Sequence, residues 1–378
     1  MSFQISFNHP SFVAKELVYI AEAIQNEHIS GDGKFTKLCN QFFETELGVK
    51  KSIMTTSCTD ALELVALLLD LQPGDEFIVP SFTFVTTASA FALRGAIPQF
   101  VDIRKDTLNI DEMRIEEKIT TKTKAIVVVH YAGVAAEMES ILKIAKKYNL
   151  PVIEDNAHGL FAKYKGRYLG TFGDFSTQSF HETKNFTCGE GGALLINNEK
   201  FIERADILKD KGTNRKKFLQ GLVDKYTWVD LGSSYVMSDI LAAFLYAQLE
   251  QYKVVQAKRK SAWNLYFQSI LPLAQKLQVQ LPYSPSECEP AYHMFYLLCQ
   301  SKEHRSALMQ HLKNHGIQSV FHYLPLNASP MGQKFGAKWG DCPVSEDISD
   351  RILRLPFYTE LSSESIHQVA EALEKFEF

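Results

Sequence analysis

The chain has 378 residues, of which 46% are hydrophobic and 22% are charged, and its formal net charge is −4. This length exceeds the ~250–300 residues at which one hydrophobic core usually stops growing, so we expect a large domain at residues 1–245 and a smaller domain at residues 246–378. The composition excludes a disordered or fibrous chain. The acidic balance argues against non-specific binding of nucleic acid, which needs a basic surface.

The six cysteines are scattered along the chain without a CxxC pair. This usage is typical of a reducing compartment and argues against a zinc site. The N-terminal segment lacks a basic region followed by an apolar one, and no apolar run approaches the ~18 residues that span a bilayer. We therefore expect a cytoplasmic protein that has no metal site and no membrane-spanning segment.

Short apolar runs alternate with helical periodicity from about residue 50 to 200, which is typical of an α/β domain with a mainly parallel sheet. The predicted strands are 52–56, 76–79, 99–102, 125–130, 151–154, 175–180 and 193–197. The first strand leads into a helix that Ser57 or Thr59 caps, and the leucines of this helix recur at the spacing of a core face.

A long helical stretch follows Ser238 and is expected to be two helices or one bent helix that leads into a small α+β part. In that part the pattern predicts strands at 292–298 and 317–320 and helices at 304–315 and 362–376.

Two motifs carry candidate chemistry, IEDNAH (residues 153–158) and SFHETKN (residues 179–185), and both follow predicted strands. Because ligands of open α/β sheets bind beyond the carboxyl ends of the strands, Asp155 and Lys184 are expected to converge on one crevice. A carboxylate and a lysine suit pyridoxal 5′-phosphate (PLP), since the anion keeps the ring nitrogen protonated and the amine binds the cofactor covalently. Taken singly, Asp155 is equally compatible with a helix cap and Lys184 with a surface lysine.

A phosphate group could bind at the helix start formed by Ser57, Cys58 and Thr59, where free N–H groups and the helix dipole favour an anion. Ser179 would add a hydroxyl, and Phe84 would offer an aromatic face to the pyridine ring. Each residue has an ordinary alternative as a helix cap or a core side chain. The order and combination of these residues favour the functional interpretation.

At these positions the chain resembles the sugar aminotransferases of the DegT/DnrJ/EryC1/StrS family. The resemblance covers nearly the whole length and rests on these motifs: GDGKFT (31–36), TTSCTDALE (55–63), EDNAHG (154–159), SFHETKNFTCGEGG (179–192), KGTNR (211–215), GSSYVMSDI (232–240), HMFY (293–296) and VFHYLPL (320–326). It implies the PLP-dependent, aspartate aminotransferase-like architecture called fold type I, with a large domain built on a mainly parallel sheet and a smaller C-terminal α+β domain.

The resemblance also implies roles for single residues in holding the cofactor. These are Lys184 as the residue that binds the cofactor and moves protons, Asp155 as the partner of the pyridinium, Phe84 as the stacking residue, and Ser57, Cys58, Thr59 and Ser179 as the phosphate site. His158 stands where the family commonly has glutamine, and an imidazole can make the same hydrogen bond to the 3-hydroxyl of the cofactor. Ser234 lies in the segment that often contributes an asparagine to the neighbouring subunit, so a hydroxyl is expected there.

Within the family, SFHETKN, KGTNR, KYTWVDLGSSY and VFHYLPL are most similar to enzymes that make dTDP-4-amino-4,6-dideoxygalactose for lipopolysaccharide or other surface glycans. This implies transamination of dTDP-4-dehydro-6-deoxyglucose by L-glutamate, which leaves as 2-oxoglutarate. The resemblance further implies a homodimer with active sites at the subunit interface and without nucleic-acid or membrane partners.

The expected substrate contacts also follow from the resemblance. Lys211, Asn214 and Arg215 would bind a carboxylate or the diphosphate across the interface, although KGTNR also fits a charged surface loop. Further contacts are expected from His322 and Tyr323 to the sugar, and from the backbone at Gly31. Asn327 stands where close relatives often have histidine.

Four alternatives remain beside this interpretation. A PLP-dependent sugar dehydratase of the same family has histidine in place of the lysine, so Lys184 argues against it. A transaminase acting at carbon 3 of the isomeric 3-keto sugar stays open. A PLP-binding regulator without turnover would need an appended DNA-binding module or a basic face, and the sequence has neither. In CGEGG (residues 188–192) the glycines lack the strand–GxGxxG–helix order of an NAD-dependent oxidoreductase, so we expect a tight turn there.

Overall fold

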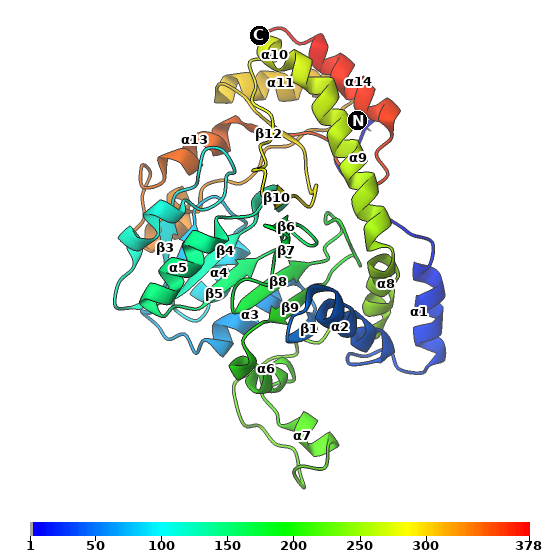
Figure 1. Cartoon of the computed structure of the whole chain (residues 1–378), viewed down its shortest axis with the longest axis vertical. Helices are drawn as coiled ribbons and strands as arrows, with labels where there is room; N and C mark the ends of the chain where they lie inside the picture. The colour runs from blue at the N-terminus through cyan, green and yellow to red at the C-terminus, as the bar shows by residue number, and fades with distance from the viewer. Residues whose placement is uncertain (1–2) are drawn as a thin grey trace.

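The computed structural model describes residues 3–378 and contains a central sheet of seven strands (Figure 1). Residues 1 and 2, the start of the predicted large domain, lie outside the described residues. The strand order is β1-β9-β8-β5-β4-β2-β3. The strands span Lys51–Thr55 (β1), Glu76–Pro80 (β2), Ile97–Val101 (β3), Thr123–Val129 (β4), Val152–Asp155 (β5), Phe175–Ser179 (β8) and Gly192–Ile196 (β9).

All seven predicted strands are therefore present, with ends shifted by at most two residues. β9 runs in the opposite direction to the other six strands of this sheet, and it pairs with β1 and β8. The prediction of a mainly parallel sheet is confirmed.

Helices cover both faces of the sheet and make a three-layer arrangement. One face carries α3 (Cys58–Leu68), α4 (Thr86–Ala92) and α6 (Ile202–Lys209), and the other carries α2 (Lys34–Leu47), α5 (Met138–Tyr148) and α8 (Asp239–Glu250), with α1 (Glu16–Gln25) against α8. Successive residues of β5 show the alternation, because Ile153 packs with the α3 leucines and Val152 with Ile141 of α5. The α3 leucines belong to the core, as predicted.

The long helical stretch after Ser238 consists of two helices, α8 and α9 (Tyr252–Ile270), which Gln251 separates with a non-helical backbone. In Figure 1, α9 leads from the sheet towards the C-terminal helices. There Tyr266 and Ile270 belong to a second core, in which α11 (Lys302–Asn314) and α14 (Ser363–Glu374) also take part. The division at residue 245 stays a prediction; Leu245 itself lies within α8 and packs with the helices beside the sheet.

The remaining elements are short. They are β6 (Lys163–Tyr164), β7 (Arg167–Tyr168), β10 (Cys288–Glu289), β11 (Tyr296–Leu298), β12 (Ile352–Arg354), α7 (Arg215–Leu219), α10 (Ala274–Leu277), α12 (Pro330–Lys334) and α13 (Pro343–Arg351), with 3-10 turns at Glu112–Arg114, Glu116–Lys118, Tyr131–Gly133, Glu199–Phe201, Leu271–Leu273 and Leu326–Ala328. None of the helices in residues 3–378 is both long and apolar enough to cross a bilayer.

Two predicted strands of the C-terminal part differ from the structure. The strand at 317–320 is wrong, because Ile317 and Val320 form isolated bridges with two different segments and build no continuous ladder. The strand at 292–298 is reduced to β11, which pairs with β12. The carbonyl groups of two residues before β11 bind a side chain and not a neighbouring strand. They accept hydrogen bonds from the buried Arg259 side chain, Tyr292 at 3.0 Å and His293 at 2.7 Å. The predicted helices at 304–315 and 362–376 are confirmed as α11 and α14.

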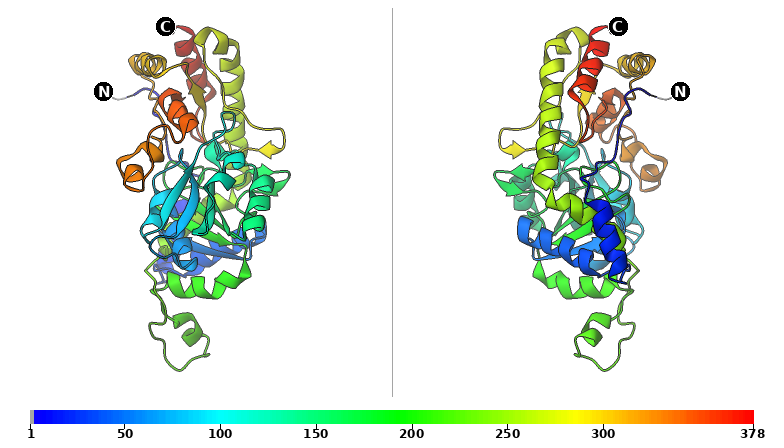
Figure 2. Two further views of the ribbon diagram at one scale, coloured as in Figure 1. Left: turned by 90° about the vertical axis from the view of Figure 1, so that its left-hand side faces the viewer. Right: turned by 90° about the vertical axis from the view of Figure 1, so that its right-hand side faces the viewer.

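A segment that we call the arm, residues 211–233, contains α7 and projects away from the body (Figures 1 and 2). Several large apolar side chains of the arm are exposed, among them Leu219, Leu222 and Trp228. Apolar side chains gathered on a protruding segment are typical of a surface that another chain covers.

Candidate active site

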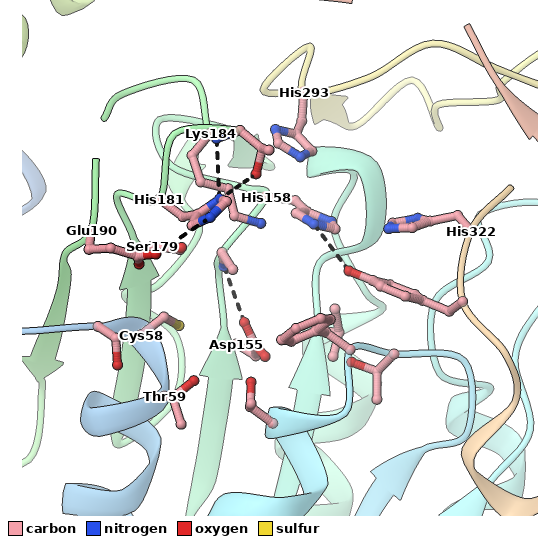
Figure 3. A pocket seen from close by; sticks show the side chains of 18 of the residues that line it. Cys58, Thr59, Asp155, His158, Ser179, His181, Lys184, Glu190, His293 and His322 are labelled. Carbon is pink, nitrogen blue, oxygen red and sulfur yellow. Dashed lines mark hydrogen bonds and ion pairs between the residues drawn. The ribbon is translucent and has the colours of Figure 1, made fainter. Parts of the chain in front are cut away.

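A cavity of about 680 Å³ lies beyond the carboxyl ends of the sheet strands (Figure 3). Asp155 is the last residue of β5, Ser179 is the last residue of β8, and Phe84 follows β2. The helix α3 begins at the same edge, because β1 and β8 are both antiparallel to β9 and so run in the same direction. The topology therefore brings the predicted cofactor residues to one place, as expected for an open α/β sheet.

Asp155 lies at the floor of this cavity and is 5% exposed. One carboxylate oxygen accepts a hydrogen bond from the Thr87 hydroxyl (2.6 Å) and the other accepts from the Ala157 N–H (3.2 Å). Burial raises the pKa of Asp155 above its ordinary value. A cationic group next to the Asp155 carboxylate would lower this pKa again, so the carboxylate is suited to bind a protonated pyridine nitrogen.

Lys184 lies in the turn between β8 and β9, where its backbone N–H donates to the His181 carbonyl (2.9 Å). Burial lowers the pKa of its amine to about 8, and the charge of Arg354 acts in the same direction. An amine must be neutral to attack a carbonyl group or to accept a proton. The cavity therefore gives Lys184 a larger neutral fraction near neutral pH than a lysine in water has.

The start of α3 provides the third part of the site. Ser57 is the N-cap, and its hydroxyl accepts a hydrogen bond from the Asp60 N–H (3.0 Å). The N–H groups of Cys58 and Thr59 belong to the first turn and have no partner within the helix. Figure 3 shows both residues beside the cavity that Lys184 also lines.

Gly192, the first residue of β9, packs directly against this helix start. A Cβ atom at this position would overlap the carbonyl carbon of Ser57 and the amide nitrogen of Cys58. The glycine cluster also forms the predicted turn, with Gly189 at a φ of +84°. Close packing of β9 against α3 thus depends on a residue without a side chain.

His158 is a buried imidazole whose Nδ1 has no hydrogen-bond partner among residues 3–378. Its ring stacks on His293 with the centroids 4.3 Å apart. His293 donates through Nδ1 to the Asn185 side-chain oxygen (2.8 Å), because the amide nitrogen of Asn185 is committed to the Ala291 carbonyl (2.8 Å). Burial lowers the pKa of both histidines well below the ordinary value, so both are neutral.

Two predicted sugar contacts, His322 and Tyr323, line the same cavity from the C-terminal part of the chain. The Tyr323 hydroxyl lies 3.4 Å from Nε2 of His158, and His322 lies 2.9 Å from the Tyr131 hydroxyl through Nδ1. Phe84 is 53% exposed and lines the cavity, so its interpretation as a core side chain is wrong and its ring face is accessible.

Five predicted residues do not line the cavity of their own chain: Gly31, Lys211, Asn214, Arg215 and Ser234. Lys211 and Arg215 both pair with the Asp210 carboxylate, at 2.8 and 3.4 Å. Gly31 is a packing glycine, since a Cβ there would lie 2.8 Å from the Val236 Cβ atom. The reach of the arm residues into a second subunit stays a prediction.

Asn327 is buried away from the cavity wall. Its side-chain oxygen accepts from the Ser81 hydroxyl (2.6 Å), and its amide nitrogen donates to Glu346 (2.7 Å). Asn327 therefore belongs to a structural network and is not among the residues that line the cavity.

The sequence interpretation missed several residues of the site, including His293, which stacks on His158. Thr87 orients Asp155, and Phe7 and Arg354 line the cavity. For Arg354 a signal was available, because it is the one charged residue in the apolar run ILRLPF (residues 352–357). Phe7 and Thr87 carry no local signal, since their role follows from contacts with distant segments.

Comparison with known proteins decides the family. The model of the DegT/DnrJ/EryC1/StrS aminotransferase family matches residues 10–374. The chain belongs to this family. It is 35% identical to GDP-perosamine synthase of Escherichia coli O157:H7, with 97% of each chain covered, and 30% identical to the spore coat polysaccharide biosynthesis protein SpsC of Bacillus subtilis, with 98% and 96% covered.

Solved structures agree with this assignment. The aminotransferase TlmJ of Streptoalloteichus hindustanus superposes with a TM-score of 0.90 at 27% identity, with 98% of each chain covered. The protein Spr1654 of Streptococcus pneumoniae, with a TM-score of 0.89 at 27% identity over 97% of each chain, has been solved in a PLP-form. The predicted fold type I architecture is confirmed, and the chain is an aminotransferase whose cofactor is PLP.

The cavity fits this cofactor. The unpartnered Nδ1 of His158, the buried Asp155 carboxylate and the free first turn of α3 correspond to a phenolic hydroxyl, a pyridine nitrogen and a phosphate. The residues that would hold PLP are Ser57, Cys58, Thr59, Phe84, Asp155, His158, Ser179 and Lys184, all of which line the cavity.

Proposed function

We propose that the chain transfers the amino group of L-glutamate to carbon 4 of dTDP-4-dehydro-6-deoxyglucose, yielding dTDP-4-amino-4,6-dideoxygalactose and 2-oxoglutarate. The observation that carries the proposal is the convergence of Lys184, Asp155 and the α3 start on one cavity. The relatives' names, GDP-perosamine synthase and a spore coat polysaccharide biosynthesis protein, support a sugar as the amino acceptor. The sequence motifs support the dTDP-linked 4-keto sugar.

In the proposed reaction the side chains of the cavity have separate roles. PLP, when bound, supplies the electron sink that makes the donor's α-hydrogen acidic. Asp155 keeps the ring nitrogen protonated, and the α3 start binds the phosphate. Lys184 binds the cofactor covalently, and its neutral amine takes a proton from the donor's α-carbon and delivers one to carbon 4 of the sugar. His322 and Tyr323 contact the sugar.

The proposal includes a homodimer in which the arm of one chain completes the cavity of the other. Among residues 3–378, the lysine and arginine side chains that line the cavity are Lys184 and Arg354, whereas a nucleotide diphosphate needs several cationic or N–H partners. Lys211, Asn214 and Arg215 would supply them from the partner, and Ser234 would reach the cofactor. The exposed apolar residues of the arm support such an interface.

Two wider expectations belong to the same proposal. We propose large and small domains at residues 1–245 and 246–378, which the separate cores beside the sheet and around α9 support. We also propose a cytoplasmic location, which is supported by six cysteines that are all free.

Product analysis tests the reaction. Holoenzyme incubated with L-glutamate and dTDP-4-dehydro-6-deoxyglucose should give a 4-amino sugar with the galacto configuration, which NMR identifies. The 3-keto isomer and a GDP-linked 4-keto sugar serve as parallel substrates. A 3-amino product would favour the 3-aminotransferase, and turnover of the GDP-linked sugar alone would refute the dTDP assignment.

A further inference from the structure

The turn that carries Lys184 is tied to a distant segment through the next residue, Asn185. Asn185 is buried, and both polar groups of its side chain are hydrogen-bonded. The amide nitrogen donates to the Ala291 carbonyl (2.8 Å), and the oxygen accepts from Nδ1 of His293 (2.8 Å). We call residues 291–293, which precede β11, the anchor. The two hydrogen bonds hold the main chain beside Lys184 against the anchor.

The anchor is itself fixed from two sides. The Ala291 N–H donates to the carbonyl of Gly133, which follows β4, at 3.0 Å. From α9, the buried Arg259 side chain donates to the carbonyls of Tyr292 (3.0 Å) and His293 (2.7 Å). A shift of the anchor would break these hydrogen bonds and leave buried polar groups without partners, which is costly. The anchor is therefore a rigid support for the turn.

His293 is a buried histidine to which the proposed reaction gives no role. It lines the cavity together with Lys184 (Figure 3), and its ring stacks on that of His158. The imidazole is neutral, and Nδ1 carries the hydrogen because the Asn185 oxygen can only accept. A phenylalanine could keep a ring against His158 but would leave that oxygen without a donor. The hydrogen bond to Asn185 is thus what an apolar ring at this position would not supply.

The covalent link to the cofactor needs the Lys184 amine at one point of the cavity. The amine forms the link by condensing with the aldehyde of PLP, and one water molecule leaves. The groups suited to the ring nitrogen and the phosphate, Asp155 and the α3 start, lie on other elements than Lys184. A misplacement of about 1 Å is sufficient to lose much of the advantage of a preformed geometry. The main chain at Lys184 must therefore be fixed relative to β5 and α3.

We propose that His293 and Asn185 are positioning residues that hold Lys184 where its amine can form the covalent link to PLP. Both act through Lys184, and the hydrogen bond between them completes the connection from the anchor to the turn. The inference rests on the proposed role of Lys184 as the residue that binds the cofactor, and it is independent of the sugar.

Binding of two cofactor forms to the full-length chain, freed of cofactor, tests this role without turnover. Pyridoxamine phosphate has an amine in place of the aldehyde of PLP, so it cannot form the link but keeps the ring nitrogen and the phosphate. Calorimetry should show that the unsubstituted chain binds PLP at least about 30-fold more tightly than pyridoxamine phosphate. His293→Phe and Asn185→Leu should each reduce this preference at least about tenfold, with little change for pyridoxamine phosphate. His293→Asn, whose amide nitrogen can replace Nδ1, should retain part of the preference.

The matched control is His304→Phe. His304 is also buried and stacks on Phe378 with the centroids 4.6 Å apart, but it lies outside the cavity, so the preference should not change. If Lys184→Ala abolishes the preference while His293→Phe keeps it in full, the inference alone fails. Equal weakening of both cofactor forms in His293→Phe would also overturn it. A preference that survives in Lys184→Ala, or that the unsubstituted chain lacks, would refute the proposed role of Lys184 and the inference with it.

Discussion

At the scale of single residues, burial shifts the pKa of several titratable groups that line the cavity. It lowers the pKa of Lys184 to about 8 and holds His158 and His293 neutral. Burial also raises the pKa of Asp155, and a cationic partner would oppose this shift. The largest consequence is for Lys184, whose amine loses its proton more readily here than that of a lysine in water.

Replacing Asp155 with asparagine tests the role of its charge. Asparagine keeps the shape and can still accept from the Thr87 hydroxyl, but it does not stabilise a protonated ring nitrogen. We expect turnover to fall by at least about 100-fold, comparable with the loss of one preorganised electrostatic contact in other enzymes. Steady-state kinetics on the cofactor-loaded variant measures the effect, and a loss of only a few-fold would show that the carboxylate is dispensable.

The pH dependence of the transfer should report the Lys184 amine. Because the neutral form is the base, the rate should rise with pH and level off above about 8. Arg354 lowers this pKa through its charge, so Arg354→Gln should move the inflection to higher pH, whereas Arg354→Lys should not. Stopped-flow rates of the glutamate half-reaction measure both profiles. An inflection that moves to lower pH in Arg354→Gln would contradict this account.

The sequence was sufficient to predict that Lys184 and Asp155 converge on one cavity, because each follows a strand of the predicted sheet. Arg354 was missed although it is the one charge in an apolar run, because its contact with the Phe7 ring joins two distant segments. The sequence also placed Lys211 and Arg215 at the substrate, whereas within one chain they pair with Asp210.

At the scale of elements, the close contact between β9 and α3 shapes the phosphate site. Gly192 pairs with Thr55 and Ser179 and lies against the helix start. Both neighbouring strands end at the cavity, so a shift of β9 would move the first turn of α3. The register of the sheet and the anion site are therefore coupled.

Gly192→Ala should weaken cofactor binding by at least about tenfold and lower the free energy of unfolding by about 1–3 kcal/mol, because the added methyl group forces α3 away from β9. A matched control is Asp239→Ala, which removes the buried carboxylate that accepts from the Thr36 N–H (2.7 Å) at the start of α2. This control should lose stability and keep its cofactor affinity. Spectroscopic titration with PLP and denaturant unfolding distinguish the two, and equal cofactor affinity in Gly192→Ala and the unsubstituted chain would refute the coupling.

The periodic pattern predicted the central sheet well, because each of its strands pairs continuously with at least one neighbouring strand. It failed at 317–320 because an extended apolar segment becomes a strand only where a neighbour offers a matching row of hydrogen bonds. It overestimated 292–298 because the buried Arg259 side chain binds carbonyls that a strand would otherwise use.

At the scale of the whole molecule, the arm is the part whose function a single chain does not explain. It extends from the body beyond α6 (Figures 1 and 2). The side chains of Leu219, Leu222 and Trp228 in the arm are exposed. The cationic residues at its base lie outside the cavity of their own chain. A second subunit would account for both features, because it would cover the apolar residues and receive the charges.

Mixed dimers test this arrangement. Lys184→Ala should be inactive, and Lys211→Ala/Arg215→Ala should be strongly impaired, if the arm serves the partner. Mixing the two under conditions that exchange subunits should restore about a quarter of the activity, since half of the dimers are mixed and each contains one intact site. If the arm served its own chain, no mixed dimer would contain an intact site, and activity would stay at the level of the variants.

The proposed reaction requires that the cofactor is attached to Lys184, and the site of attachment can be measured. Borohydride treatment of the holoenzyme should fix the covalent link, and mass spectrometry of the digested protein should find the cofactor on the peptide that contains Lys184. The Lys184→Ala variant should yield no modified peptide and no turnover. Attachment to another lysine, or unchanged turnover in Lys184→Ala, would show that Lys184 does not hold the cofactor.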